Sequence, residues 1–158
     1  MAPHTGPWTV DMVRELPDDG NRYECVGGVL LVTPAPSWLH QWALDALQKR
    51  LAPYVRAAAC GVLVRSPADV RLGTGALVQP DLFVIPMEEG RRPAGEGDVD
   101  RLLLAVEVLS ATTAARDRGE KRRLYQRFAD EVLIWQPAGT GRPLSIGLAE
   151  LFREVWEG

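Results

Sequence analysis

Lysine is almost absent from this chain: of its 18 basic residues, only Lys49 and Lys121 are lysines and the rest are arginines. Cysteine is equally scarce, and the isolated Cys25 and Cys60 indicate neither a disulfide framework nor a zinc cluster. No apolar run approaches the ~20 residues that cross a membrane, and the N-terminus lacks the pattern of a secretory signal. Walker, HExxH and GxSxG motifs are also missing, which argues against nucleotide-loop, zinc-peptidase and serine-hydrolase chemistry.

The composition, with 46% hydrophobic and 25% charged residues, is typical of a soluble globular protein. We expect one domain over residues 1–158, a disordered N-terminus over residues 1–7, reduced cysteines, a cytoplasmic location and no membrane association. The net charge of −3 does not by itself indicate a nucleic-acid-binding protein. Basic charge is instead concentrated in residues 116–127, and the simplest interpretation of that run taken alone is a solvated helix face.

Helical and strand patterns alternate along the sequence. We expect helices over residues 11–16, 38–58, around Lys121 and over 148–156, with Thr9 and Ser37 as N-caps of the first two. Expected strands cover residues 23–26, 29–32, 61–65, 68–72, 78–85, 102–109 and 132–135. The polar, glycine-rich residues 88–100 are expected to form a loop. Hairpins mixed with helical crossovers predict an α/β fold with a mixed β-sheet flanked by helices.

The long helix over residues 38–58 is expected to bury one apolar stripe. Its predicted members are Leu39, Trp42, Ala43, Ala46, Leu47, Leu51 and Tyr54. Trp38 and Trp42, spaced i and i+4, are interpreted as core or interface residues rather than as a platform for stacking bases.

Lys121 occupies the apolar side of its predicted helix. Helical spacing places Asp117, Leu124, Tyr125 and Phe128 on the same face. Because arginine is used almost everywhere else, a lysine here indicates a need for a compact ammonium with a tunable pKa rather than a planar guanidinium.

Two carboxylates are candidates to meet this lysine. Asp81 lies near the start of the expected strand over residues 78–85, and Glu107 lies in a strand that is apolar on both faces. An unpaired ionised Glu in such a strand costs roughly several kcal/mol, so it needs a cation, a metal or strong donors. Two acids and a lysine on adjacent strand, strand and helix predict a site for a metal and a water molecule.

Each of these residues also has a purely structural interpretation. Asp81 would then only begin a strand, Glu107 would form a buried salt bridge with an arginine, and Lys121 would extend its ammonium to solvent from an otherwise buried stem. Glu24 is a further metal or supporting carboxylate or, equally, part of a hairpin salt bridge. His40, on the first turn of a helix, is interpreted as structural.

Five short motifs occur together and in order: Tyr23-Glu24…Gly27-Gly28, Pro34…Ser37…His40, Gln79-Pro80-Asp81-Leu82, Val106-Glu107-Val108-Leu109-Ser110 and Asp117…Lys121…Tyr125. Together they resemble the restriction endonuclease family labelled Uma-two, in the PD-(D/E)xK nuclease superfamily. The resemblance covers about residues 8–135. It implies a restriction-endonuclease-like fold and a divalent metal, usually Mg²⁺, with Mn²⁺ as a substitute.

Carried over by position, the resemblance makes Asp81 and Glu107 metal ligands, joined by the backbone carbonyl of Val108. The superfamily usually places its lysine two residues after the glutamate, where this chain has Leu109; the lysine of this family is instead in the next helix, which matches Lys121. Supporting roles are expected for Glu24, His40 and Tyr125. The family's Pro-Glu-Tyr-Trp and Asp-Pro residues are replaced by the run Asp130–Pro137, and a strand or hairpin usual after it is missing.

These observations predict a Mg²⁺-dependent DNA endonuclease in which Asp81 and Glu107 bind the metal and Lys121 positions the attacking water. Arg116, Arg118, Arg122 and Arg123 are expected to hold flanking phosphates. DNA is the expected binding partner, and a second copy of the chain, in a homodimer, is a further one. The alternative is a degenerate nuclease fold that acts as a nucleic-acid-binding or protein-assembly module without catalysis.

Overall fold

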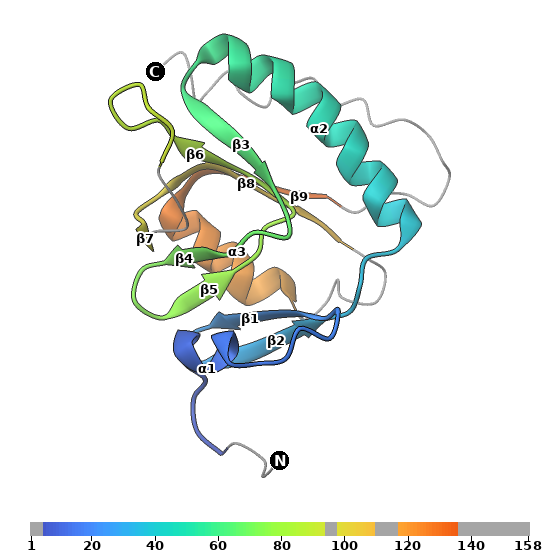
Figure 1. Ribbon diagram of the computed structural model, residues 1–158, viewed down its shortest axis with the longest axis vertical. Coiled ribbons are helices and arrows are strands. Elements are labelled where there is room, and N and C mark those ends of the chain that lie inside the picture. Colours follow the sequence, from blue (N-terminus) through green and yellow to red (C-terminus); the bar gives the residue numbers. More distant parts are fainter. Residues whose placement is uncertain (1–4, 94–97, 110–116, 136–158) are drawn as a thin grey trace.

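The computed structural model describes residues 5–93, 98–109 and 117–135, which form an α/β fold (Figure 1). Its helices are α1 (Val10–Arg14), α2 (Trp38–Ala58) and α3 (Asp117–Phe128). Its strands are β1 (Arg22–Val26), β2 (Val29–Thr33), β3 (Gly61–Arg65), β4 (Val70–Leu72), β5 (Ala76–Val78), β6 (Leu82–Pro86), β7 (Asp98–Val99), β8 (Leu102–Val108) and β9 (Ala129–Trp135). The expected fold class is confirmed. The predicted helix over residues 148–156 lies outside the described residues.

The strands form two sheets rather than one. One has the order β2-β1-β5-β4-β7 and the other β3-β6-β8-β9. Both are mixed, because β4 and β7 pair in parallel, as do β8 and β9, while the other pairs are antiparallel. Figure 1 shows α2 along one side of the four-stranded sheet and α3 on the side toward the five-stranded sheet. Residues 98–99, expected in a loop, form the short strand β7.

The single strand expected over residues 78–85 is wrong, because the chain passes from one sheet to the other within it. β5 ends at Val78 and β6 begins at Leu82, with Gln79, Pro80 and Asp81 between them. Proline has no amide hydrogen to donate to a ladder, so the pairing cannot run unbroken through this segment. Asp81 therefore lies at the junction of the two sheets rather than inside one strand.

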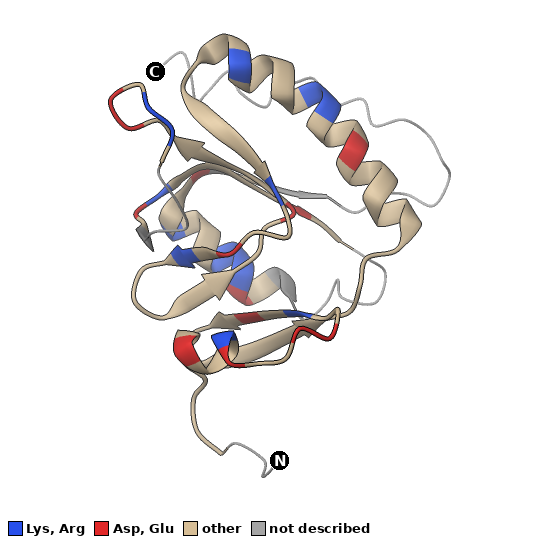
Figure 2. Cartoon of the chain, in the orientation of Figure 1, with Lys and Arg blue, Asp and Glu red and all other residues tan. Residues whose placement is uncertain are grey.

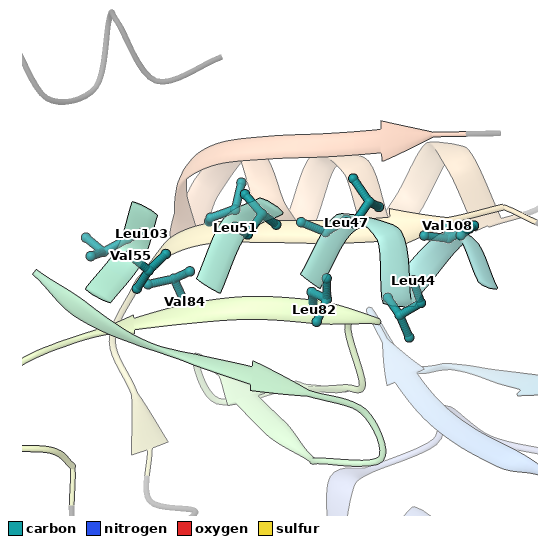
Figure 3. Packing of buried hydrophobic residues seen from close by; sticks show 11 residues of the cluster. Leu44, Leu47, Leu51, Val55, Leu82, Val84, Leu103 and Val108 are labelled. Atoms are coloured by element: carbon teal, nitrogen blue, oxygen red, sulfur yellow. The ribbon is translucent and has the colours of Figure 1, made fainter. Parts of the chain in front are cut away.

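Helix α2 packs its apolar side on the four-stranded sheet, where leucines and valines from α2, β6 and β8 interlock (Figure 3). The buried α2 side chains are His40, Ala43, Leu44, Leu47, Leu51 and Val55. The predicted stripe was therefore rotated: Leu39 and Trp42 are exposed, and Leu44 and Val55 were missed. Both sets of positions follow helical spacing, but the sheet packs against the side of α2 that carries Leu44 and Val55.

The opposite face of the four-stranded sheet forms a second core with α3 and the five-stranded sheet. Phe83, Leu102 and Ala105 pack there with Leu124 and Tyr125 of α3. Every residue of β8 is buried, as the apolar sequence predicted. Because neighbouring residues of a strand point to opposite faces, Glu107 follows Ala105 toward α3.

Charged residues lie mainly on the outer surface. Figure 2 shows an acidic position on α2, Asp45, followed by basic positions, Lys49, Arg50 and Arg56, toward the end of the helix. Neither α1, α2 nor α3 is both long and apolar enough to cross a bilayer.

We expect Leu51→Ala to lower the free energy of unfolding by about 2–5 kcal/mol, because Leu51 is fully buried between α2 and the sheet. Leu39→Ala on the same helix removes an exposed side chain and serves as the matched control, with a change near 0.5 kcal/mol. Urea denaturation measures both. Equal losses in the two variants would contradict the packing described.

Candidate metal and phosphodiester site

The antiparallel pairing of β6 and β8 brings Asp81 and Glu107 to one end of the four-stranded sheet. Leu82 pairs with Val106, so the residues just beyond this pair, Asp81 and Glu107, are neighbours across the sheet. Both carboxylates are buried. Two residues that are 26 positions apart in the sequence therefore share one small volume, as the sequence predicted.

Asp81 is held by three donors from three different segments. Arg22 Nη2 of β1 lies 3.0 Å from Oδ1, His40 Nε2 of α2 lies 3.1 Å from Oδ2, and the amide of Val108 donates to Oδ2 over 2.8 Å. Burial alone would raise the pKa of Asp81, but the His40 hydrogen bond and the attraction of Arg22 hold it below its ordinary value. Asp81 is thus kept ionised, and it does more than begin a strand.

Lys121 is buried between two carboxylates. Its Nζ lies 2.6 Å from Glu107 Oε1 and 2.9 Å from Glu24 Oε1, and its side chain is only 5% exposed. The interpretation of Lys121 as a lysine that reaches solvent is therefore wrong. The buried partner of Glu107 is this lysine rather than an arginine, and Glu24 pairs with Lys121 rather than within its hairpin.

The ammonium of Lys121 stays protonated in this environment. Burial alone would lower its pKa, but the Glu107 and Glu24 charges outweigh this effect and raise the pKa above its ordinary value. A lysine held in the charged form cannot accept a proton from water. It can donate hydrogen bonds and stabilise negative charge, so its chemistry is that of a fixed cation.

Glu107 receives two hydrogen bonds on the same oxygen. Tyr125 Oη donates to Oε1 over 2.6 Å, and Lys121 contacts that same atom. Burial raises the pKa of Glu107 to about 7 despite the attraction of Lys121, and the charges of Asp81 and Glu24 add to the increase. The same burial and the Glu107 charge raise the pKa of Tyr125 well above its ordinary value, so Tyr125 remains a donor.

The donors at this site suit a hard divalent cation. Three buried carboxylates (Glu24, Asp81 and Glu107) face two permanent positive charges, Arg22 and Lys121. Burial is the main cause of the raised pKa of Glu107, and the charges of Asp81 and Glu24 add to it. Mg²⁺ needs only one or two carboxylates and keeps several waters. The described residues contain no group of three or more His, Cys, Asp or Glu side chains that could hold a metal ion, so an ion held by one or two of these carboxylates would need water for its other ligands.

Some of the other residues predicted for the site lie next to its carboxylates and others do not. His40 and Tyr125 contact the carboxylates as described, whereas Val108 presents its amide to Asp81. Arg122 and Arg123 are exposed on α3, away from the buried face that carries Lys121. Arg116 and the side chain of Arg118 lie outside the described residues.

Arg22 was missed by the sequence reasoning. Its guanidinium contacts both Asp81 Oδ1 and the carbonyl oxygen of Gln79, each over 3.0 Å. Glu24, two residues along the same strand, accepts a hydrogen bond from the Gln79 amide over 2.7 Å. Together they fix the segment on either side of Pro80. Side chains alternate between the faces of a strand, so Arg22 and Glu24 lie on one face of β1. This spacing in the sequence could have indicated that Arg22 lies near the site.

We expect Glu107→Gln to flatten the pH dependence of stability in EDTA between about pH 4.5 and about pH 7. Because the folded state raises the pKa of Glu107, its stabilising contribution is complete below the unfolded pKa and is lost as the pH rises toward about 7. The lowered pKa of Asp81 and the raised pKa of Lys121 act below and above this window.

Urea denaturation across that range measures the effect. The difference between wild type and Glu107→Gln at each pH gives the contribution of the Glu107 carboxyl. The exposed Glu15→Gln serves as the control. Identical pH profiles for wild type and Glu107→Gln would contradict the assignment.

Comparison with known proteins identifies the family and the fold. The sequence matches the family Uma2, described as "Putative restriction endonuclease", over residues 10–140. A putative nuclease belonging to DUF820 from Anabaena variabilis ATCC 29413 has the same fold, with a TM-score of 0.69 and 17% identity over 89% of this chain and 82% of that one. A search of curated proteins found no match. The chain therefore belongs to the Uma2 family of putative restriction endonucleases.

Proposed function

We propose that the protein is a divalent-metal-dependent endonuclease that hydrolyses phosphodiester bonds of DNA in the cytoplasm. The observation that carries the proposal is the buried group of Asp81, Glu107 and Lys121, in which two carboxylates and a protonated lysine meet at one end of the sheet. Negative charge develops on the phosphate oxygens in the transition state of phosphodiester hydrolysis, so the lysine and a cation held by the carboxylates would both stabilise it.

Asp81 and Glu107 would hold the metal, with Mg²⁺ as the natural ion and Mn²⁺ as a substitute, and the Val108 carbonyl would complete the protein ligands. A bound Mg²⁺ would supply charge stabilisation for the phosphate and an activated water. Arg22 and His40 keep Asp81 ionised and oriented. Lys121 orients the water by hydrogen bonding and stabilises negative charge at the reacting phosphate.

The arginines of α3 would bind the DNA backbone. Arg122 and Arg123 are exposed on the helix that carries Lys121, and Arg116 and Arg118 precede them in the sequence. Contacts from arginine to phosphate fix position without selecting a base sequence. Helix α3 would thus carry both a catalytic residue and residues that bind DNA.

One observation favours a second function, that of a binding or assembly module without catalysis. Arg22 and Lys121 already pair with all three buried carboxylates. Such pairing lets the fold exist without a bound ion, so metal binding itself must be tested.

We expect purified protein to nick supercoiled plasmid with Mg²⁺ or Mn²⁺ and not with EDTA. Asp81→Asn and Lys121→Met are expected to lower the rate by roughly a hundredfold or more, because the charges they remove are worth several kcal/mol in the transition state. Asp45→Asn and Lys49→Met, which change an exposed ion pair on α2, are the matched controls.

Two outcomes of the nicking assay would reject the assignment. Cutting that survives in Asp81→Asn would mean a contaminant or a different site. A Lys121→Met protein that loses DNA binding while keeping its turnover would exclude the role given to this lysine. Thermal unfolding of each variant shows that the compared proteins are folded.

We expect Mg²⁺ to raise the melting temperature of the wild-type protein, since a ligand that binds only the folded state stabilises it by mass action. Asp81→Asn is expected to abolish the increase, and Asp45→Asn to retain it. Differential scanning calorimetry with and without Mg²⁺ measures both. An equal shift in Asp81→Asn would show that the ion binds elsewhere, and no shift in wild type would favour the binding module.

A further inference from the structure

Two tryptophans near the N-terminal end of α2 are exposed, on the side of the helix opposite His40. Trp38 is 79% exposed and Trp42 is 65% exposed. Their ring centroids are 6.2 Å apart and the planes are inclined by 58°. Of the two expectations for these residues, core or interface, the core one is therefore wrong. Two neighbouring indoles exposed together mark a candidate interaction surface.

The same helical turn reaches the catalytic carboxylate. His40, between the two tryptophans in sequence, contacts Asp81 over 3.1 Å. Each tryptophan is two residues from His40, so it is displaced by roughly 3 Å along the helix axis and lies on the other side of a helix about 10 Å wide. The indoles are thus about one helix width, roughly 10 Å, from the side of α2 that contacts Asp81.

A positive charge lies at the same end of the sheet. Arg65 ends β3, opposite Leu82, and the next amide, that of Ser66, donates to the Asp81 carbonyl oxygen over 3.1 Å. The Arg65 guanidinium donates to the side-chain oxygens of Gln41 and Gln48 on α2. Among the described residues it meets no carboxylate, so its charge is held in place but not neutralised.

We propose that Trp38, Trp42 and Arg65 form a binding surface for unpaired nucleotides, so that the substrate of the proposed nuclease contains a single-stranded segment. Indole faces stack on bases of any sequence, and a nearby arginine binds the intervening phosphate. Paired bases inside a duplex offer no free face to stack on. This inference rests on the proposed function and names its substrate class.

Protein interfaces also favour tryptophan and arginine. The residues around the two tryptophans favour nucleic acid as the bound partner. Arg65 is held by the neutral amides of Gln41 and Gln48, and the first turn of α2 carries no acidic residue that would repel phosphate. The same end of α2 contacts Asp81 through His40 on its buried side. A second copy of the chain is the competing occupant that the experiment must exclude.

The test is fluorescence anisotropy in EDTA with labelled oligothymidylate of about 12 nucleotides, a typical site size for such surfaces, and with a duplex of equal length. We expect the double variant Trp38→Leu/Trp42→Leu to bind the single strand roughly tenfold or more weakly, with little change for the duplex. Arg65→Gln should weaken single-strand binding as well. Val32→Ala and Arg56→Gln, which alter an exposed valine and an exposed arginine elsewhere, are the controls and should leave it unchanged.

Equal loss for single strand and duplex, or no loss in the double variant, would overturn the inference. So would dimers in sedimentation velocity that dissociate in the double variant while DNA binding persists, because the indoles would then face a second copy. Because binding is measured without metal, a protein that shows the expected binding but cuts no DNA would refute only the proposed catalysis. A protein that cuts DNA with unchanged single-strand binding would refute only this inference.

Discussion

The site depends on one buried ammonium shared by two carboxylates. Lys121 of α3 contacts Glu24 in the five-stranded sheet and Glu107 in the four-stranded sheet. The Glu24 carboxylate also holds the Gln79 amide, two residues before Asp81. Removing one partner of a buried ion pair costs roughly 3–5 kcal/mol, because the remaining charges lie away from water. Both sheets and α3 are therefore joined by the charges that the chemistry would use.

The choice between lysine and arginine differs at the two cationic positions for a geometric reason. Lys121 lies between two carboxylates in a closed space, where a compact ammonium with three donors fits. Arg22 spans two acceptors in different directions, the Asp81 carboxylate and the Gln79 carbonyl, and the guanidinium fork matches that separation. In a chain with 16 arginines and two lysines, the buried lysine pairs with two carboxylates at once.

The local pattern was sufficient for part of this site. The burial of Glu107 followed from the apolar run around it, and the inward face of Lys121 followed from helical spacing. Local spacing could show only that Arg22 shares a face with Glu24, because the contact of Arg22 with Asp81 joins residues 59 apart and depends on how the two sheets meet. The break at Pro80 and the rotation of α2 were missed for a related reason. In both cases tertiary packing outweighed the pattern of a single segment.

The separation of these residues along the chain has a consequence for how the protein is made. Lys121 and Glu24 are 97 residues apart, so a chain that emerges N-terminus first presents Glu24, Asp81 and Glu107 before their lysine exists. Until α3 is present, the carboxylates repel one another. Bringing Lys121 to Glu24 also carries the entropy cost of closing a long loop, which the new contacts must offset. The core between α2 and the four-stranded sheet needs no residue of α3. The nascent protein can therefore begin to form this hydrophobic core before Lys121 is available to complete the site.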